Sequence, residues 1–195
     1  MTIPAEALAC VAFAHGSGSG RLSPRNRLVA GALNDAGLAT LLLDLLTPRE
    51  EGDRRNVFDV ELLAARLVRA TGWLEEQPET RDLAPCYFGA STGAAAALRA
   101  ASGAGTNVRS VVSRGGRPDL AGPWLAGVRS PTLLIVGSLD DVVLSLNREA
   151  LAALPCEAEL AVVPGATHLF EEAGTLEQVA LLARDWFLRH LEAPG

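Results

Sequence analysis

The chain has 195 residues, of which 49 % are apolar and 21 % are charged, a composition typical of a folded protein and not of a disordered one. All 17 basic residues are arginines, scattered singly or in small groups within a net charge of −6, so the basic stripe of a nucleic-acid-binding protein is missing. No apolar run is long enough to cross a membrane, and the first residues lack the pattern of a signal peptide. We therefore expect a cytoplasmic protein that binds neither nucleic acid nor membrane.

The three cysteines are an odd number without close spacing. Cys10 and Cys86 lie in apolar runs, and we predict that they are reduced thiols in the core, whereas Cys156 should be more exposed. Free cysteines agree with a cytoplasmic location. We expect neither a metal ion nor a cofactor.

The first half of the chain alternates apolar runs of strand length with helical patterns. We predict a buried strand at residues 8–14 and a helix that starts after the capping hydroxyl of Ser23 and ends before Gly37. A second strand at 38–46, a polar loop at 48–56 and an amphipathic helix at about 57–77 should follow.

The second half continues this alternation. We predict strands at 86–89, 108–113, 132–137 and 159–163, and helices from the turn after residue 89 to about 102, at 146–154 and at 175–191. Apolar strands separated by helices are typical of a mostly parallel sheet that is covered on both faces. The prediction is a three-layer α/β fold in one domain spanning residues 1–195, with about six strands.

The first loop admits two interpretations. Glycines at 16–20 after a strand, with Asp44 near the end of the next strand, resemble the beginning of a dinucleotide-binding fold, but the last glycine of that fingerprint would fall on Arg21. A phosphate-binding P-loop needs a lysine, which the chain lacks. The other interpretation comes from the loops further along the chain.

The stretch Gly89-Ala-Ser-Thr-Gly93 joins an apolar run to an alanine-rich helical run. Glycines two residues before and after Ser91 let a strand turn sharply into a helix with the serine exposed at the bend, as a nucleophile requires. The pattern alone is weak, because glycine, alanine and serine are abundant here. Ser91 needs partners before it can be regarded as more than a helix start.

Those partners follow in the order Ser…Asp…His, each after a predicted strand. Asp140 lies three residues beyond Gly137, and His168 lies on a turn before the last helix. Because loops at the carboxyl ends of parallel strands converge, the three side chains should meet as a catalytic triad. Asp141 is the rival for the acid role, and Asp140 is preferred for its distance from Gly137.

The loop after the first strand should supply the remaining part of the site. Backbone N–H groups of Ser17 and of Thr92, the residue after the nucleophile, could stabilise the oxyanion of an acyl-transfer reaction. His15 should shape this loop and not act as the base. Only residues 114–131 separate the fourth and fifth strands, which leaves no room for a lid domain, so the site should be shallow and open.

With these parts in place, the sequence resembles a small α/β-hydrolase of the dienelactone hydrolase-like group. The matching stretches are H-G-S-G-S-G at 15–20, G-A-S-T-G at 89–93, G-S-L-D-D-V-V at 137–143 and G-A-T-H-L-F at 165–170. Dienelactone hydrolases proper use a cysteine nucleophile, so Ser91 favours a serine esterase that acts on small ester, thioester or lactone substrates. Relatives usually begin with a β-hairpin, for which this chain has no room, and the exposed sheet edge could favour a homodimer.

Two questions stay open at this point. Arg21, Arg114 and Arg117 could hold an anionic substrate or could be solvated loop residues. Relatives are sometimes joined to phosphoribosyltransferase domains, so the alternative function is a non-catalytic binding or accessory domain on the same scaffold.

Overall fold

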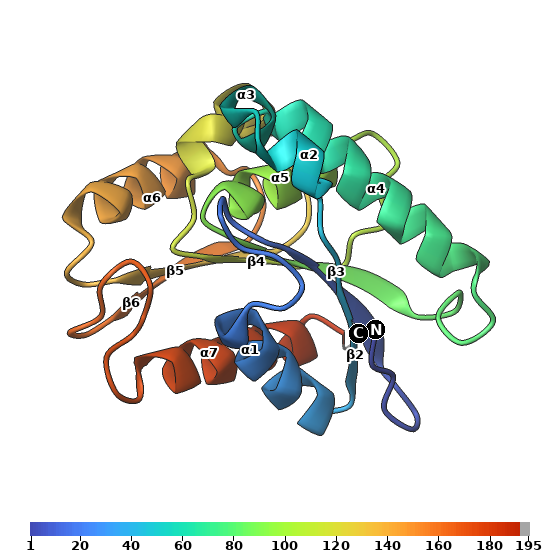
Figure 1. Cartoon of the computed structure of the whole chain (residues 1–195). Helices are drawn as coiled ribbons and strands as arrows, with labels where there is room; N and C mark the ends of the chain where they lie inside the picture. Colours follow the sequence, from blue (N-terminus) through green and yellow to red (C-terminus); the bar gives the residue numbers. More distant parts are fainter. Residues whose placement is uncertain (192–195) are drawn as a thin grey trace.

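A sheet of six parallel strands runs through the middle of the molecule, in the order β2-β1-β3-β4-β5-β6 (Figure 1). The structure, a computed structural model, describes residues 1–191. The strands are β1 (Ala9–Ala14), β2 (Leu38–Leu42), β3 (Ala84–Ala90), β4 (Val111–Arg114), β5 (Thr132–Gly137) and β6 (Ala158–Val163). The predicted α/β class and strand number are therefore confirmed.

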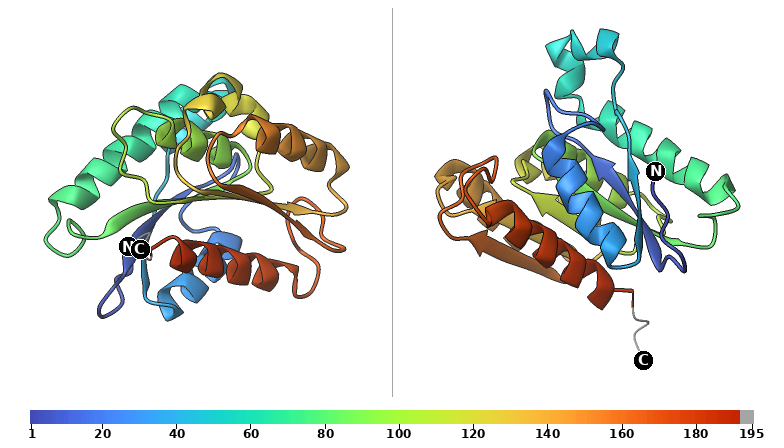
Figure 2. Two further views of the ribbon diagram at one scale, coloured as in Figure 1. Left: turned by 180° about the vertical axis from the view of Figure 1, so that it is seen from behind. Right: turned by 60° about the horizontal axis from the view of Figure 1, so that its bottom comes forward.

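Helices cover both faces of the sheet. On one face lie α1 (Pro24–Asp35) and α7 (Thr175–Arg189); on the other lie α4 (Val60–Glu76), α5 (Thr92–Ala101) and α6 (Asp141–Ala153), as Figures 1 and 2 show. Side chains alternate along each strand, so Val11 and Phe13 pack in the core beneath α1 and α7, whereas Ala12 and Ala14 pack in the other core. The inner strands β1, β4 and β5 thus have two buried faces, as their apolar sequences require, whereas most residues of the edge strand β6 are at least partly exposed.

The predicted polar loop at 48–56 is wrong, because two short helices form there, α2 (Pro48–Glu51) and α3 (Arg54–Val57). The first begins with a capping box in which Thr47 and Glu50 exchange side-chain and backbone hydrogen bonds, and a proline occupies the first turn. Both helices lie above the edge of the sheet where the strands end (Figure 1).

Other boundaries also differ from the prediction. β2 ends at Leu42 and not at residue 46, and α6 begins at Asp141, five residues before the predicted start. Residues 118–127, expected as part of a loop, form a 3₁₀ helix, η1 (Pro118–Gly127). The helix start matters most, because it puts Asp140 at the N-cap position of α6.

The outer edge of β2 is partly covered. Thr2 and Thr40 exchange two backbone hydrogen bonds of 2.9 Å in an antiparallel bridge. The homodimer stays a prediction.

The structure confirms the predictions for the cysteines in part. Cys10 and Cys86 are buried and free, and burial raises the pKa of the two thiols to about 12 and about 11. Cys156 is half-buried and not fully exposed.

None of the helices at residues 1–191 is long and apolar enough to span a bilayer.

Two glycines allow α5 to pack against the sheet at very short range. A Cβ on Gly93 would lie 2.1 Å from the Ala14 carbonyl oxygen, and one on Gly89 would lie 2.4 Å from the Ala94 Cα. Only glycine leaves room for this approach of one backbone to another. The approach fixes the start of α5 beside the end of β1.

We predict that Gly93→Ala lowers the free energy of unfolding by about 3 kcal/mol or more, because the new methyl group would overlap carbonyl groups that β1 holds in place. Urea or thermal unfolding measures the change. Gly72→Ala is the matched control, since a Cβ there, inside α4, meets no atom within 4 Å. That substitution should raise stability by about 1 kcal/mol, and equal effects of the two would contradict the account.

Candidate active site

Ser91 occupies the sharp turn between β3 and α5. Its φ is 50° and its ψ is −119°, a backbone conformation that residues other than glycine rarely adopt. The Ser91 N–H donates to the Arg114 carbonyl at 3.2 Å, and the Ser91 carbonyl accepts from the Arg117 N–H at 3.1 Å. The strained turn is therefore held from both sides by the segment that follows β4.

Thr92 and Ser17, the two expected oxyanion donors, lie next to each other. The Ser17 N–H donates to the Thr92 hydroxyl at 3.1 Å. The Thr92 N–H belongs to the first turn of α5, whose N–H groups have no acceptor within the helix. Two backbone donors thus lie beside the Ser91 turn, and one of them already has a weak acceptor.

His15 connects the first loop to the segment after β2. Its Nε2 accepts from the Leu45 N–H at 2.9 Å, so Nδ1 carries the proton and donates to the Gly16 carbonyl at 3.0 Å. The side chain is buried. Both ring nitrogens have backbone partners, which agrees with the shaping role expected for His15.

His168 and Asp140 form a direct pair, with 2.6 Å between Nδ1 and Oδ2. The carboxylate accepts the Nδ1 proton, which leaves Nε2 of the neutral imidazole with a lone pair. The Asp140 side chain is 15 % exposed and the imidazole 38 %, so the acid lies behind a ring that solvent reaches. Asp141 is exposed in the first turn of α6 and has no bond to His168.

The loops that carry Asp140 and His168 are joined along their length. The Leu139 N–H donates to the Ala166 carbonyl at 2.9 Å, and the Gly165 N–H donates to the Ser138 hydroxyl at 2.8 Å. A Cβ on Gly137 would lie 2.3 Å from the Ala166 oxygen, so only glycine permits this contact. The glycine that ends β5 therefore brings the acid to the histidine.

Residues 114–117 connect the histidine to the serine. A Cβ on Gly115 would lie 3.5 Å from Nδ1 and Cε1 of His168, so the imidazole rests on this glycine. The fully buried Asn147 of α6 holds the segment by donating to the Gly116 carbonyl at 3.0 Å. Asn147 could not be singled out from the sequence, where its only signal is a polar residue on the buried face of a helix.

Glu172 holds the turn that carries His168. Its carboxylate accepts from the Thr167 hydroxyl at 2.7 Å and from the Thr167 N–H at 3.1 Å. These hydrogen bonds lower the pKa of the Glu172 carboxyl group below its ordinary value. This residue, too, was missed, because a carboxylate four positions after a histidine has no distinctive pattern.

The three arginines in question have different surroundings. Arg114 is 7 % exposed and lies over the Phe170 ring, so it is not a solvated loop residue; burial, and then nearby Arg25, lower its pKa to about 10. Arg117 pairs with Asp119 at 2.7 Å. Neither guanidinium is bonded to Ser91, Asp140 or His168 among the described residues.

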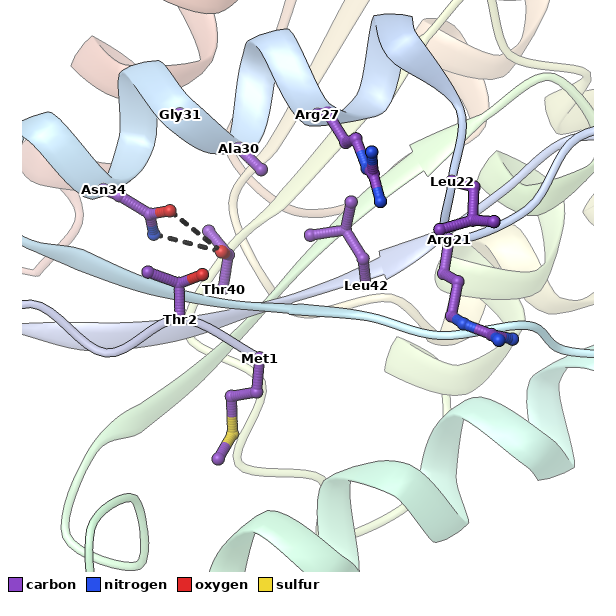
Figure 3. Close-up of a pocket in the computed structure, with 10 residues that line it drawn as sticks. All are labelled: Met1, Thr2, Arg21, Leu22, Arg27, Ala30, Gly31, Asn34, Thr40 and Leu42. Atoms are coloured by element: carbon purple, nitrogen blue, oxygen red, sulfur yellow. Dashed lines mark hydrogen bonds between the residues drawn. The ribbon is translucent and has the colours of Figure 1, made fainter.

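Arg21 lines a separate cavity of about 360 Å³ between α1 and the edge strand β2, shown in Figure 3. Its guanidinium pairs with Asp44, and the backbone N–H of Arg21 donates to the same carboxylate at 2.7 Å. Asp44, which a dinucleotide site would use for ribose, thus closes the first loop instead. The dinucleotide interpretation is wrong, because the acid is occupied and Arg21 replaces the required glycine.

Comparison with known proteins identifies the family. No family model matches the chain. The solved structure of a dienelactone hydrolase from Anabaena variabilis has 54 % sequence identity and a TM-score of 0.94, over 97 % of this chain and 90 % of that chain. The chain belongs to the dienelactone hydrolase family. Est1E of Butyrivibrio proteoclasticus, with a TM-score of 0.82 over 97 % of this chain and 90 % of that chain, is 13 % identical and shows the α/β-hydrolase fold alone.

Longer relatives have a different name. Two curated proteins of Mycobacterium tuberculosis, from strains CDC 1551 and H37Rv, are 64 % identical over 195 residues, and both carry the provisional name phosphoribosyl transferase. The match covers all of this chain but 44 % of theirs, so the chain spans less than half the length of these relatives. The family assignment therefore rests on the dienelactone hydrolase structure, of which the chain covers 90 %.

The Glu172 contacts predict a pH-dependent stability. Because folding lowers the pKa of this carboxyl group below 4.5, its ionised form stabilises the turn above about pH 4.5, and the contribution is lost as the pH falls through the folded-state pKa. Glu172→Gln should therefore lower the Tm at neutral pH, and the difference from the unsubstituted chain should shrink in acid. Glu79→Gln is the control, since that carboxylate is exposed and has neither an ion-pair partner nor a hydrogen-bond donor within residues 1–191. A Glu172→Gln deficit that stays constant from neutral to acid pH would contradict this role.

Proposed function

We propose that this chain is a serine hydrolase that cleaves ester, thioester or lactone bonds of small substrates through Ser91, His168 and Asp140. The observation that carries the proposal is the 2.6 Å pair between His168 and Asp140, connected through Gly115 and Arg114 to the strained turn at Ser91. Family membership supports hydrolysis as the reaction class. The choice of serine as the nucleophile rests on its position in the turn.

In the proposed reaction, the Ser91 hydroxyl oxygen attacks the carbonyl carbon while His168 Nε2 takes the hydroxyl proton. The bond from the carbonyl carbon to the leaving oxygen then breaks, and His168 gives the proton to that oxygen, which leaves an acyl group on Ser91. A water molecule then gives a proton to His168 and attacks the acyl carbon. The bond from that carbon to the Ser91 oxygen breaks, the acid leaves, and His168 returns the proton to Ser91. Asp140 keeps the imidazole in the required tautomer and stabilises the imidazolium.

The negative charge that develops on the carbonyl oxygen needs donors that are already in place. The Thr92 and Ser17 N–H groups are the candidates, and the N-terminus of α5 adds a favourable dipole. The 3.1 Å bond from Ser17 to the Thr92 hydroxyl must lengthen or become shared when the oxyanion binds. Substitutions at Ser17 should therefore have small effects, because its backbone is the donor.

We predict that Ser91→Ala and His168→Ala lower kcat on p-nitrophenyl butyrate by about 10⁴-fold or more, and Asp140→Asn by about 10⁴-fold. Asp141→Asn is the matched control and should retain most activity, because that carboxylate has no bond to His168. Circular dichroism should show each variant folded. An active Ser91→Ala variant, or equal losses in the two aspartate variants, would contradict the proposed triad.

A chain inert toward a broad panel of esters would favour the alternative, a non-catalytic accessory domain. The longer Mycobacterium tuberculosis relatives are the observation that keeps this alternative in view.

A further inference from the structure

A cavity of about 200 Å³ opens directly beside the two candidate oxyanion donors. One wall is the first loop, residues 15–18, together with Thr92 at the start of α5. The apolar part of the lining comes from Leu46, Val57 and Leu63, which belong to the segment after β2, to α3 and to α4. Glu51, the last residue of α2, completes the lining. The cavity therefore exists because α2 and α3 fold over the strand ends.

The position of the cavity indicates which part of a substrate it would hold. In the proposed reaction the leaving oxygen must lie near His168 to receive its proton. Neither His168 nor any residue of the loops that carry it and Asp140 lines this cavity. A carbonyl whose oxygen binds to Ser17 and Thr92 therefore has its leaving group on the His168 side and its acyl group on the side of the cavity.

The surroundings of His168 fit the same orientation. Leu139 and Val142, on either side of the aspartate pair, are 62 % and 74 % exposed, and Leu169 is 38 % exposed. Apolar side chains on an open surface can contact a leaving group but cannot limit its size. The enclosed side of the site is the acyl side.

The volume limits the acyl group. An engineered apolar cavity of about 150 Å³ in another protein binds benzene, so 200 Å³ has room for a benzoyl group or a short acyl chain. Leu46 and Leu63 are buried and fixed by the core, whereas Val57 is half-buried. Val57 is therefore the position where the size of the cavity can be changed with least damage to the fold.

The charge at the cavity limits the acyl group further. Glu51 is exposed, and within residues 1–191 its carboxylate has neither an ion-pair partner nor a hydrogen-bond donor. No arginine lines the cavity to compensate for it. The Glu51 carboxylate would repel an acyl group that carries a free carboxylate of its own, because like charges a few ångströms apart repel each other even near solvent.

We propose that this cavity is the acyl pocket of the enzyme and that it selects short, uncharged acyl groups, up to about the size of benzoyl, against acyl groups that end in a carboxylate. This assignment rests on the proposed hydrolase function. Val57 sets the length of the pocket, and Glu51 sets its charge preference.

The experiment compares kcat/KM for p-nitrophenyl esters with acetyl, butyryl, benzoyl and succinyl groups, the last carrying a free carboxylate. The unsubstituted chain should prefer butyryl and benzoyl over succinyl. Val57→Phe should lower kcat/KM for the benzoyl ester about ten-fold more than it lowers kcat/KM for the acetyl ester, because only the larger acyl group reaches the new ring. Val57→Ala should keep or increase turnover of the benzoyl ester.

Glu51→Gln should raise the succinyl-to-butyryl ratio about three- to five-fold, since the carboxylate is exposed and screened. Glu76→Gln, which removes one negative charge from an exposed position at the end of α4, is the control and should leave the ratio unchanged. A ratio that does not respond to Glu51→Gln, or a Val57→Phe variant that loses acetyl and benzoyl turnover equally, would overturn the acyl pocket while the hydrolase function stands. Absence of turnover for all four esters would overturn both.

Discussion

The close packing of the α5 backbone against the end of β1 is the constraint on which the rest of the site depends. Gly93 touches the Ala14 and His15 carbonyl groups where any other residue would carry a side chain. This contact puts Thr92 beside Ser17 and forces the chain through the strained conformation at Ser91. The strain at Ser91 persists because β3 and α5, which flank the turn, are both packed in the core and fix its two ends.

The second half of the site is assembled by the same means at β5. Gly137 lets the acid loop lie against the histidine loop, and backbone hydrogen bonds join the two. Residues 114–117 then connect the two halves, and Asn147 of α6 holds Gly116 by a hydrogen bond to its carbonyl. A reactive group that must stay within hydrogen-bond distance of its partner is thus attached to strand ends and not to free loops.

Much of this arrangement could be predicted from the sequence, because it depends on order. Continuous apolar strands fix a parallel sheet, and a parallel sheet brings the loops after β3, β5 and β6 to one edge. The contribution of α2 and α3 could not be predicted in that way. Only a capping box around Thr47 separates a short helix from a polar loop, and the acyl cavity depends on which of the two forms.

The partners of Arg114 and Arg21 could not be predicted from the sequence either. Arg114 is buried at the end of β4, where its guanidinium lies 5.8 Å from the centre of the Phe170 ring, a contact between residues far apart in the chain. Pairing of Arg21 with Asp44 closes the first loop on a strand end. Sequence patterns register charge and spacing, but they do not show which charge faces which.

The central claim is that Ser91 is a nucleophile activated by His168. Its most direct test is to incubate the folded chain with a fluorophosphonate, which reacts with activated serines, and to locate the adduct by peptide mass spectrometry. The account predicts one adduct, on Ser91, that is abolished in the His168→Ala variant. An unlabelled chain, or an adduct on any other residue, would contradict it.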